Sequence, residues 1–201
     1  MDICFATNNA HKVREINQLL GDRFRVKSLA DIGCTEELPE NQTTLAGNSE
    51  EKATYVHQHY RVNCFADDTG LEVDALQGQP GVYSARYAGP QRDSEDNMQL
   101  LLSELSDKSD RSPEGRAAQF RTVITLWLDE QMHQFEGIVR GRIASERTGS
   151  QGFGYDPIFI PEGYDRSFAD MTSEEKNHVS HRGRAVRQLV QFLEDYVPPH
   201  A

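Results

Sequence analysis

The alternation of short strand-like runs with amphipathic helical segments is the feature that most narrows the folds open to this chain. An apolar run at residues 2–7 is followed, within 9–20, by apolar residues at helical spacing: Val13, Ile16, Leu19 and Leu20. A strand-like run at 23–29 and a helical run at 43–60 repeat the pattern. This order predicts an α/β fold, because alternating strands and helices favour parallel crossovers.

Later segments add antiparallel elements to this plan. Residues 117–129 and 131–143 are long β-like runs joined by a short polar break, which predicts a hairpin. We expect two separate strands at 63–68 and 71–76, on either side of Thr69-Gly70. The other expected elements are a helix at 93–105, a strand within 151–161 and a helical region from Ser173 onward. Together they predict one domain over residues 1–201, with a mixed β-sheet flanked by helices.

Composition and charge exclude several classes of protein. The 201 residues carry a formal net charge of −11, which argues against binding long nucleic acid, since that requires a basic surface. No window approaches about eighteen consecutive apolar residues, so we expect no membrane span. Residues 1–12 lack the apolar run of a signal peptide, which favours a cytoplasmic location. Cys4, Cys34 and Cys64 are odd in number and widely spaced, which argues against a disulfide framework or a zinc site.

The segment Phe-Ala-Asp-Asp-Thr-Gly, at 65–70, places two adjacent carboxylates at the end of an expected strand. Side chains alternate faces along a strand, so Asp67 and Asp68 are not expected to point the same way if the strand is regular. A carboxylate there suits Mg²⁺, which prefers hard oxygen ligands together with water and substrate phosphates. It can also activate a water molecule as a general base. The alternative is a polar turn whose acids cap neighbouring N–H groups.

The segment Ala-Thr-Asn-Asn-Ala-His-Lys, at 6–12, lies between the first expected strand and the first expected helix. A helix N-terminus attracts phosphate oxygens through its backbone N–H groups and its dipole. Thr7, Asn8 and Asn9 can add side-chain donors, and Lys12 can add charge. The GxxxxGK[ST] spacing of a P-loop is missing here. The alternative is an ordinary capped turn, with Asn8 or Asn9 as the N-cap.

Two segments near the C-terminus are further candidates for ligand binding. Residues 151–159 combine glycines with aromatic side chains able to stack on a base and an acid able to contact a base edge. A basic cluster favours an anionic ligand in so acidic a chain, and it consists of Lys176, His178, His181, Arg182 and Arg184. The alternatives are a turn that leads into a core strand and a solvated helix face. Lys52, alone, is typical of an exposed helix lysine paired with a glutamate.

Five blocks of sequence occur in an order that resembles the non-canonical purine nucleoside triphosphate pyrophosphatases, the inosine/xanthosine triphosphatase family. The blocks are Thr-Asn-Asn-Ala-His-Lys at 7–12, the acidic segment at 65–76, Gly-Gln-Pro-Gly-Val-Tyr-Ser-Ala-Arg-Tyr-Ala-Gly at 78–89, Gly-Phe-Gly-Tyr-Asp-Pro-Ile-Phe at 152–159, and 175–185. The resemblance implies two lobes around a deep nucleotide-binding cleft and a homodimer. It also implies Mg²⁺-dependent hydrolysis of ITP, dITP and XTP to the monophosphate and pyrophosphate.

The resemblance also implies roles for individual residues. Asp68 is similar to the acid that activates the attacking water and helps to hold Mg²⁺, and Glu40 is similar to the second metal-associated acid. The residues that resemble the triphosphate-binding set are Thr7, Asn8, Asn9, Ala10, His11, Lys12 and Lys52, with Thr69 as a neighbouring substrate contact. The residues that resemble the base pocket are Phe153, Gly154, Tyr155, Asp156, Lys176, His181 and Arg182.

Three positions depart from the family pattern. His11 brings a bulky side chain to the loop expected to hold the triphosphate, where glycine is commoner. Gly47 stands where many bacterial relatives carry glutamate, and Thr69 replaces a common serine while keeping the hydroxyl. The alternative functions are a Mg²⁺ phosphatase, a pyrophosphatase for a modified pyrimidine nucleotide, and a nucleotide-binding module without activity.

Overall fold

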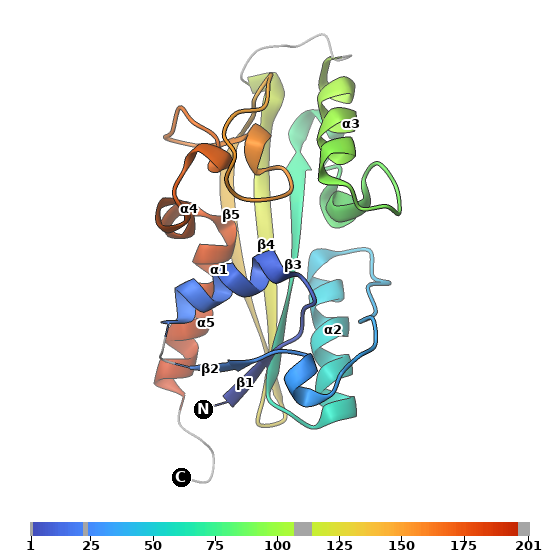
Figure 1. Ribbon diagram of the computed structural model, residues 1–201, viewed down its shortest axis with the longest axis vertical. Helices are drawn as coiled ribbons and strands as arrows, with labels where there is room; N and C mark the ends of the chain where they lie inside the picture. Colours follow the sequence, from blue (N-terminus) through green and yellow to red (C-terminus); the bar gives the residue numbers. More distant parts are fainter. Residues whose placement is uncertain (1, 22–23, 107–113, 197–201) are drawn as a thin grey trace. The chain divides into compact units, whose positions relative to one another are not determined.

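The computed structural model describes residues 2–21, 24–106 and 114–196 (Figure 1). Its strands are β1 Asp2–Phe5, β2 Arg25–Lys27, β3 Cys64–Val73, β4 Ala117–Leu128, β5 Gln131–Ile143 and β6 Phe159–Pro161. Its α-helices are α1 Ala10–Leu20, α2 Leu45–Tyr60, α3 Ser94–Ser106, α4 Ser173–Val179 and α5 His181–Asp195. Within the described ranges, no helix has both the length and the apolar character needed to cross a membrane.

The six strands form one mixed sheet in the order β2-β1-β3-β4-β5-β6. β1 pairs in parallel with β2 and with β3, whereas β5 and β6 are antiparallel. The expected hairpin is present between β4 and β5, where Asp129 and Glu130 both have positive φ angles of 46° and 65°, as a tight two-residue turn requires. The predicted α/β class with a mixed sheet is therefore confirmed.

The chain divides into two compact units, and three strands continue from one unit into the other. The first unit contains residues 1–68, 122–137 and 182–201, and the second contains 69–121 and 138–181. β3 passes from the first unit to the second between Asp68 and Thr69. Asp67 and Asp68 are therefore the last two residues of β3 that belong to the first unit.

In the first unit, alternation along β1 and β3 sends side chains into two separate cores. Ile3, Phe5 and Phe65 pack with apolar residues of α1 and α5, and the rings of Phe5 and Phe65 stack with centroids 4.6 Å apart. Cys4 and Cys64, on the opposite face, pack with Ala53 and Val56 of α2. Strand parity thus assigns odd-numbered residues of this part of β3 to α1 and α5, and even-numbered residues to α2.

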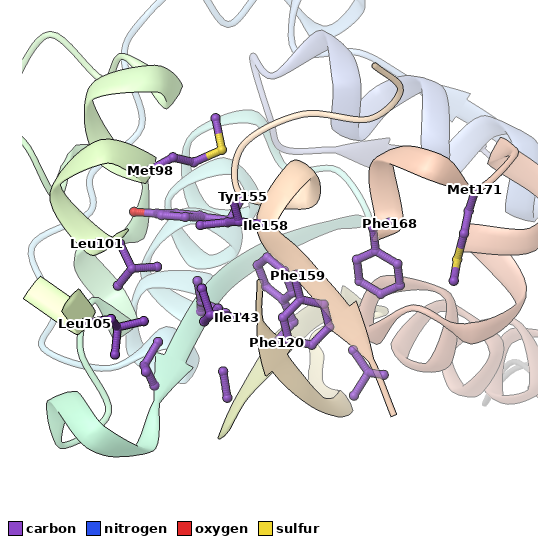
Figure 2. Packing of buried hydrophobic residues seen from close by; sticks show 14 residues of the cluster. Met98, Leu101, Leu105, Phe120, Ile143, Tyr155, Ile158, Phe159, Phe168 and Met171 are labelled. Carbon is purple, nitrogen blue, oxygen red and sulfur yellow. The ribbon is translucent and has the colours of Figure 1, made fainter. Parts of the chain in front are cut away.

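The second unit has its own aromatic-rich core, shown in Figure 2. Met98, Leu101 and Leu105 of α3 supply one side of it, as the helical spacing predicts. The rings of Phe120 and Phe159 meet edge to face with centroids 4.7 Å apart. Burial of such aromatic and aliphatic groups fixes the loops that carry residues 152–156.

One expectation about an individual element is wrong. No break occurs at Thr69-Gly70, because β3 is one continuous strand and residues 74–76 form a short 3-10 helix instead of a strand. β3 lies between β1 and β4 and is buried along almost its whole length, so pairing on both sides outweighs the weak strand propensity of glycine. The expected helical region from Ser173 onward is confirmed and consists of two helices, since Ser180 is extended, with φ −68° and ψ 157°, and ends α4.

Candidate functional site

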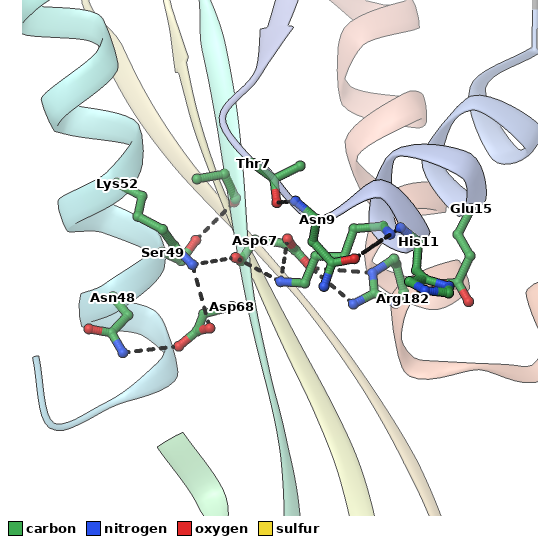
Figure 3. A network of polar contacts seen from close by, with 12 residues as sticks. Thr7, Asn9, His11, Glu15, Asn48, Ser49, Lys52, Asp67, Asp68 and Arg182 are labelled. Atoms are coloured by element: carbon green, nitrogen blue, oxygen red, sulfur yellow. Dashed lines mark hydrogen bonds and ion pairs between the residues drawn. The ribbon is translucent and has the colours of Figure 1, made fainter. Parts of the chain in front are cut away.

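Asp67 and Asp68 point to opposite faces of β3 and belong to different environments (Figure 3). Asp67 contacts residues from α1 and α5, whereas Asp68 contacts residues of α2. This arrangement follows from the alternation of side chains along a regular strand. Two adjacent carboxylates are tolerated because each has its own set of positively charged or hydrogen-bonding partners.

Asp67 is a buried anion held by two cations. Its Oδ1 lies 2.8 Å from the Nζ of Lys12, and its Oδ2 accepts hydrogen bonds from the Nε and Nη2 of Arg182 at 3.2 and 3.1 Å. Arg182 also pairs with Glu15 on α1. Burial alone would raise the pKa of Asp67, but the charges of Lys12, Arg182 and Lys52 outweigh burial and hold that pKa well below its usual value.

Asp68 is held more loosely, between an amide and an ammonium group. Its Oδ2 accepts a hydrogen bond of 3.1 Å from the Nδ2 of Asn48, and its Oδ1 lies 3.5 Å from the Nζ of Lys52. The same Nζ lies 2.7 Å from the Oε1 of Glu40 and donates to the backbone oxygen of Asp67 at 2.9 Å. Burial raises the pKa of Asp68, and the charges of Lys52 and Lys12 offset this effect only in part. A carboxylate with a raised pKa is a stronger base than usual.

The N-terminus of α1 is a capped turn in which the side chain of Asn9 is the cap. Its Oδ1 accepts hydrogen bonds from the backbone N–H groups of His11 and Lys12 at 2.9 and 3.2 Å, so these two amides are already bonded. Thr7 Oγ1 accepts from the Asn9 N–H at 3.2 Å, while Asn8 and Ala10 are exposed. The Nδ1 of His11 accepts from the Nη2 of Arg14 at 2.8 Å, since the guanidinium can only donate.

In the second unit, a buried ion pair brings together three of the seven residues expected at a base pocket. The Nζ of Lys176 lies 2.6 Å from the Oδ2 of Asp156, and both side chains are buried. The backbone N–H of Phe153 donates to the same oxygen at 2.7 Å. The Lys176 ammonium also lies 4.9 Å from the centre of the Phe153 ring. Gly152 is required beside this pair, because its φ is 77° and a Cβ would lie 2.1 Å from the Asp156 carboxylate.

The other expected base-pocket residues have different surroundings. Tyr155 is part of the apolar core, and its hydroxyl donates to the backbone oxygen of Ser84 at 2.9 Å. His181 stacks on Phe120 with ring centroids 4.7 Å apart. Gly154 has a φ of 63° with open space where a side chain would project. Thr69, the expected substrate contact next to Asp68, is half-buried on β3.

Eight of the expected residues thus belong to two groups of interacting side chains, one in each unit. We call the first the carboxylate–cation group, which comprises Lys12, Glu15, Glu40, Asn48, Lys52, Asp67, Asp68 and Arg182. The second is the Asp156–Lys176 group, with Phe153. Arg182 was expected among the base-pocket residues, but its hydrogen bonds to carboxylates lie in the first group.

Sequence reasoning missed two members of the carboxylate–cation group. Asn48 lies four residues before Lys52 on α2, and Glu15 lies three residues after Lys12 on α1. Residues three or four apart share a helix face, so this spacing was an available signal. The sequence alone did not predict a role for Asn48, because an asparagine in a helix is also typical of a solvent-exposed position.

Comparison with known proteins identifies the family. The model of the Ham1 family matches residues 3–192. A dITP/XTP pyrophosphatase from Flavobacterium psychrophilum is 52% identical over 195 residues, which cover 97% of this chain and 100% of the relative. One from Porphyromonas gingivalis is 52% identical over 191 residues, covering 95% and 96%. A HAM1 protein of known structure from Coxiella burnetii superposes with a TM-score of 0.87 at 34% identity, covering 98% of this chain and 100% of that one. The chain belongs to the Ham1 family.

Proposed function

We propose that this chain, an enzyme of the nucleoside triphosphate pyrophosphatase class, hydrolyses dITP, ITP and XTP to the monophosphate and pyrophosphate. The relatives named dITP/XTP pyrophosphatase support the substrate class, at up to 52% identity over nearly the whole chain. The structural observation that carries the proposal is the carboxylate–cation group. There a carboxylate with a raised pKa, Asp68, lies beside a buried lysine and a second acid.

Asp68 acts in this proposal as the general base. It takes a proton from a water molecule that attacks the α-phosphorus, and pyrophosphate leaves. Hydrolysis of a phosphoanhydride needs little covalent chemistry from the protein, so positioning and charge stabilisation supply most of the rate. Lys12 and Lys52 stabilise the charge that develops on the phosphate oxygens. Each such interaction contributes about 2–4 kcal/mol when judged from the loss of single oxyanion-hole donors.

The charges of the carboxylate–cation group favour a divalent metal at this site. Lys12, Lys52 and Arg182 face four carboxylates, Glu15, Glu40, Asp67 and Asp68. These seven side chains provide no excess of positive charge for a triphosphate. Enzymes that hydrolyse nucleoside triphosphates generally use a divalent metal, which neutralises phosphate charge.

Glu40 and Asp68 are the residues that would hold such a metal. Both contact the Lys52 ammonium, at 2.7 and 3.5 Å, so both carboxylates lie beside a single cation. Within the described part of the chain, no three His, Cys, Asp or Glu side chains are grouped so that they could hold a metal ion by themselves. Two carboxylates nevertheless fit Mg²⁺, which commonly takes its other ligands from water and substrate phosphates. When bound, the ion would polarise and neutralise the phosphate oxygens.

The Asp156–Lys176 group is suited to select the base. Hypoxanthine and xanthine carry an acceptor, O6, where adenine carries a donor amino group. A donor such as the Lys176 ammonium is satisfied by O6 and left facing another donor by adenine. Each buried unpaired polar group costs about 1–3 kcal/mol. The ring of Phe153, which already lies under the Lys176 ammonium, is the proposed stacking partner for the base.

Isotope labelling of the products tests the position of attack. We expect turnover of dITP in ¹⁸O-labelled water to place one labelled oxygen in dIMP and none in pyrophosphate, because Asp68 directs water to the α-phosphorus. Mass spectrometry of both products checks this result. Label in pyrophosphate, or release of orthophosphate as a first product, contradicts the proposal and favours the alternative of a Mg²⁺ phosphatase.

Three features stay predictions: the nucleotide-binding cleft between two lobes and the homodimer, which the family resemblance implies, and the cytoplasmic location, which the sequence of residues 1–12 favours. The presence of two compact units is compatible with two lobes. The net charge of −11 continues to argue against long nucleic acid as a partner. The proposed partner is a small nucleotide, whose charge would be neutralised by a bound metal together with Lys12 and Lys52 rather than by the field of the whole protein.

A further inference from the structure

We propose that Asn48 is a positioning residue for Asp68, whose carboxylate it holds in the orientation needed to accept a proton from water. This inference rests on the proposed function, since it assigns Asn48 a role through the general base of that reaction. Asn48 lies on the face of α2 that meets β3, four residues before Lys52, and is 1% exposed. Figure 3 shows it beside Asp68, with Lys52 on the same helix.

The orientation of the Asn48 amide is fixed by both of its ends. Its Oδ1 accepts a hydrogen bond of 2.9 Å from the backbone N–H of Gln42. A backbone N–H can only donate, so the oxygen of the amide must face Gln42 and the nitrogen must face Asp68. The Nδ2 then donates to the Oδ2 of Asp68 at 3.1 Å. Asn48 therefore links the carboxylate of Asp68 to the backbone of Gln42 by two hydrogen bonds, so the position of Gln42 determines the orientation of this carboxylate.

The segment that carries Gln42 is itself anchored at both ends. The backbone N–H and Nδ2 of Asn41 donate to the carboxylate of Glu51, at 2.8 and 3.1 Å. Thr44 caps α2 by accepting from the Gly47 N–H at 3.0 Å. A loop held in this way is a stable reference point for the Asn48 amide.

Gly47 allows the loop to approach α2 closely. A Cβ on Gly47 would lie 2.8 Å from the Cβ of Gln42 and 3.0 Å from the Oγ1 of Thr44, closer than carbon atoms pack without displacement. A larger side chain at position 47 would therefore displace Gln42 or Thr44. Glycine at this position thus lets the Gln42 N–H reach Asn48.

The consequence for Asp68 is that its two oxygens have different partners. Oδ2 is taken by Asn48, while Oδ1 lies 3.5 Å from the Lys52 ammonium, beyond hydrogen-bond distance. Without Asn48, the carboxylate could rotate about its Cβ–Cγ bond toward Lys52. Catalysis is sensitive to such changes, because a displacement of about 1 Å costs on the order of 100-fold in rate.

Kinetics and binding of Asn48 variants test this role. We expect Asn48→Ala to lower kcat for pyrophosphate release from dITP by about 10- to 100-fold. We expect the number of binding sites and the affinity for α,β-methylene-dITP, measured by isothermal titration calorimetry with Mg²⁺, to stay unchanged. Asn48→Asp is a second variant of nearly the same shape. It keeps the acceptor for the Gln42 N–H but loses the donor to Asp68, so we expect a loss of kcat at least as large.

Asn63→Ala is the matched control. Asn63 also joins a side-chain carboxylate to a backbone N–H, since its Nδ2 donates to Asp129 Oδ1 at 3.2 Å and its Oδ1 accepts from the Asp129 N–H at 3.0 Å. These contacts join the residue before β3 to the β4–β5 turn, and Asn63 lies four residues before Asp67 in the sequence. We expect this variant to keep the kcat of the wild type.

The outcomes separate this inference from the proposed function. If both Asn48 variants keep the wild-type kcat while Asp68→Asn is inactive, the positioning role is wrong and the proposed function stands. The number of binding sites per chain reports the fraction of correctly folded protein. If kcat falls only in proportion to this number, or if both variants fail to fold, Asn48 has a structural role and the inference is also wrong. If the wild type releases no pyrophosphate from dITP, the proposed function itself fails.

Discussion

Replacement of Asp68 by asparagine is expected to lower kcat for pyrophosphate release by about 10²- to 10⁴-fold, the range that general bases contribute. The variant keeps the size of the side chain and an oxygen that can accept the hydrogen bond from Asn48 Nδ2. It removes the carboxylate that takes the proton from water. Affinity for α,β-methylene-dITP should be kept only in part, because Lys12, Lys52 and Glu40 remain but one of the two carboxylates proposed to hold the metal is lost.

The stability of the Asp68→Asn variant provides an internal check. Burial raises the pKa of Asp68 in the folded protein, so its charged form is less favourable there than in the unfolded chain. This cost of the charged form to stability is absent when the pH lies below both the unfolded-state and the folded-state pKa. It grows as pH rises from the unfolded pKa to the folded pKa, and it is fully present at pH 7. We therefore expect an unchanged or higher melting temperature at pH 7. Near-normal kcat in a well-folded variant would contradict the assignment of the general base.

Replacement of Asp67 by asparagine is expected to have the opposite profile, with a large loss of stability. Lys12 and Arg182 would remain buried beside a neutral side chain. Removal of one partner from a buried ion pair costs about 3–5 kcal/mol, because it leaves an uncompensated charge. Urea unfolding at pH 7 measures this loss as a lower midpoint. The pairing of Arg182 with Glu15 should keep the loss within that range.

The pH dependence and a surface control make the Asp67 prediction specific. The pKa of Asp67 lies well below its usual value, so its contribution to stability is fully present above the unfolded pKa of about 4 and is lost as pH falls toward the folded pKa. The difference between wild type and variant should therefore shrink below about pH 4. Asp74→Asn is the control, since Asp74 pairs with Arg140 at 2.7 Å but is 52% exposed, and exposed pairs contribute little. Equal unfolding midpoints for wild type and Asp67→Asn would contradict a structural role for this ion pair.

Local sequence patterns predicted much of the fold because helical spacing, strand alternation and helix capping each depend on residues that are close together in the sequence. Apolar residues at helical spacing predicted α1 and α3, and alternation predicted that Asp67 and Asp68 diverge. The preference of asparagine for the N-cap predicted a cap at Asn8 or Asn9, and the structure has it at Asn9. The continuity of β3 through Thr69-Gly70 was not predictable in this way, because it depends on pairing with both neighbouring strands.

The residues of the site could largely be predicted from the sequence, but the contacts between their side chains could not. The resemblance to a known family pointed to Asp68, Glu40 and Lys52, and the structure brings these three together. The contacts of Arg182 with Asp67 and Glu15 span 115 and 167 residues of sequence, and no local pattern reports such distances. The role of Asn48 likewise depends on a loop whose path toward α2 is set by tertiary packing.

A measurement of pyrophosphate release from ITP, dITP, XTP, GTP and ATP with Mg²⁺ tests the central claim most directly. Adenine differs from hypoxanthine and xanthine at two polar positions, since it has an amino group in place of O6 and an acceptor N1 in place of N1–H. Because each mismatch costs about 1–3 kcal/mol, we predict kcat/KM values for ITP, dITP and XTP at least about 30-fold above the value for ATP. The monophosphate should appear in equal amount with pyrophosphate. Equal turnover of ATP and ITP, or release of orthophosphate alone, would contradict the proposal.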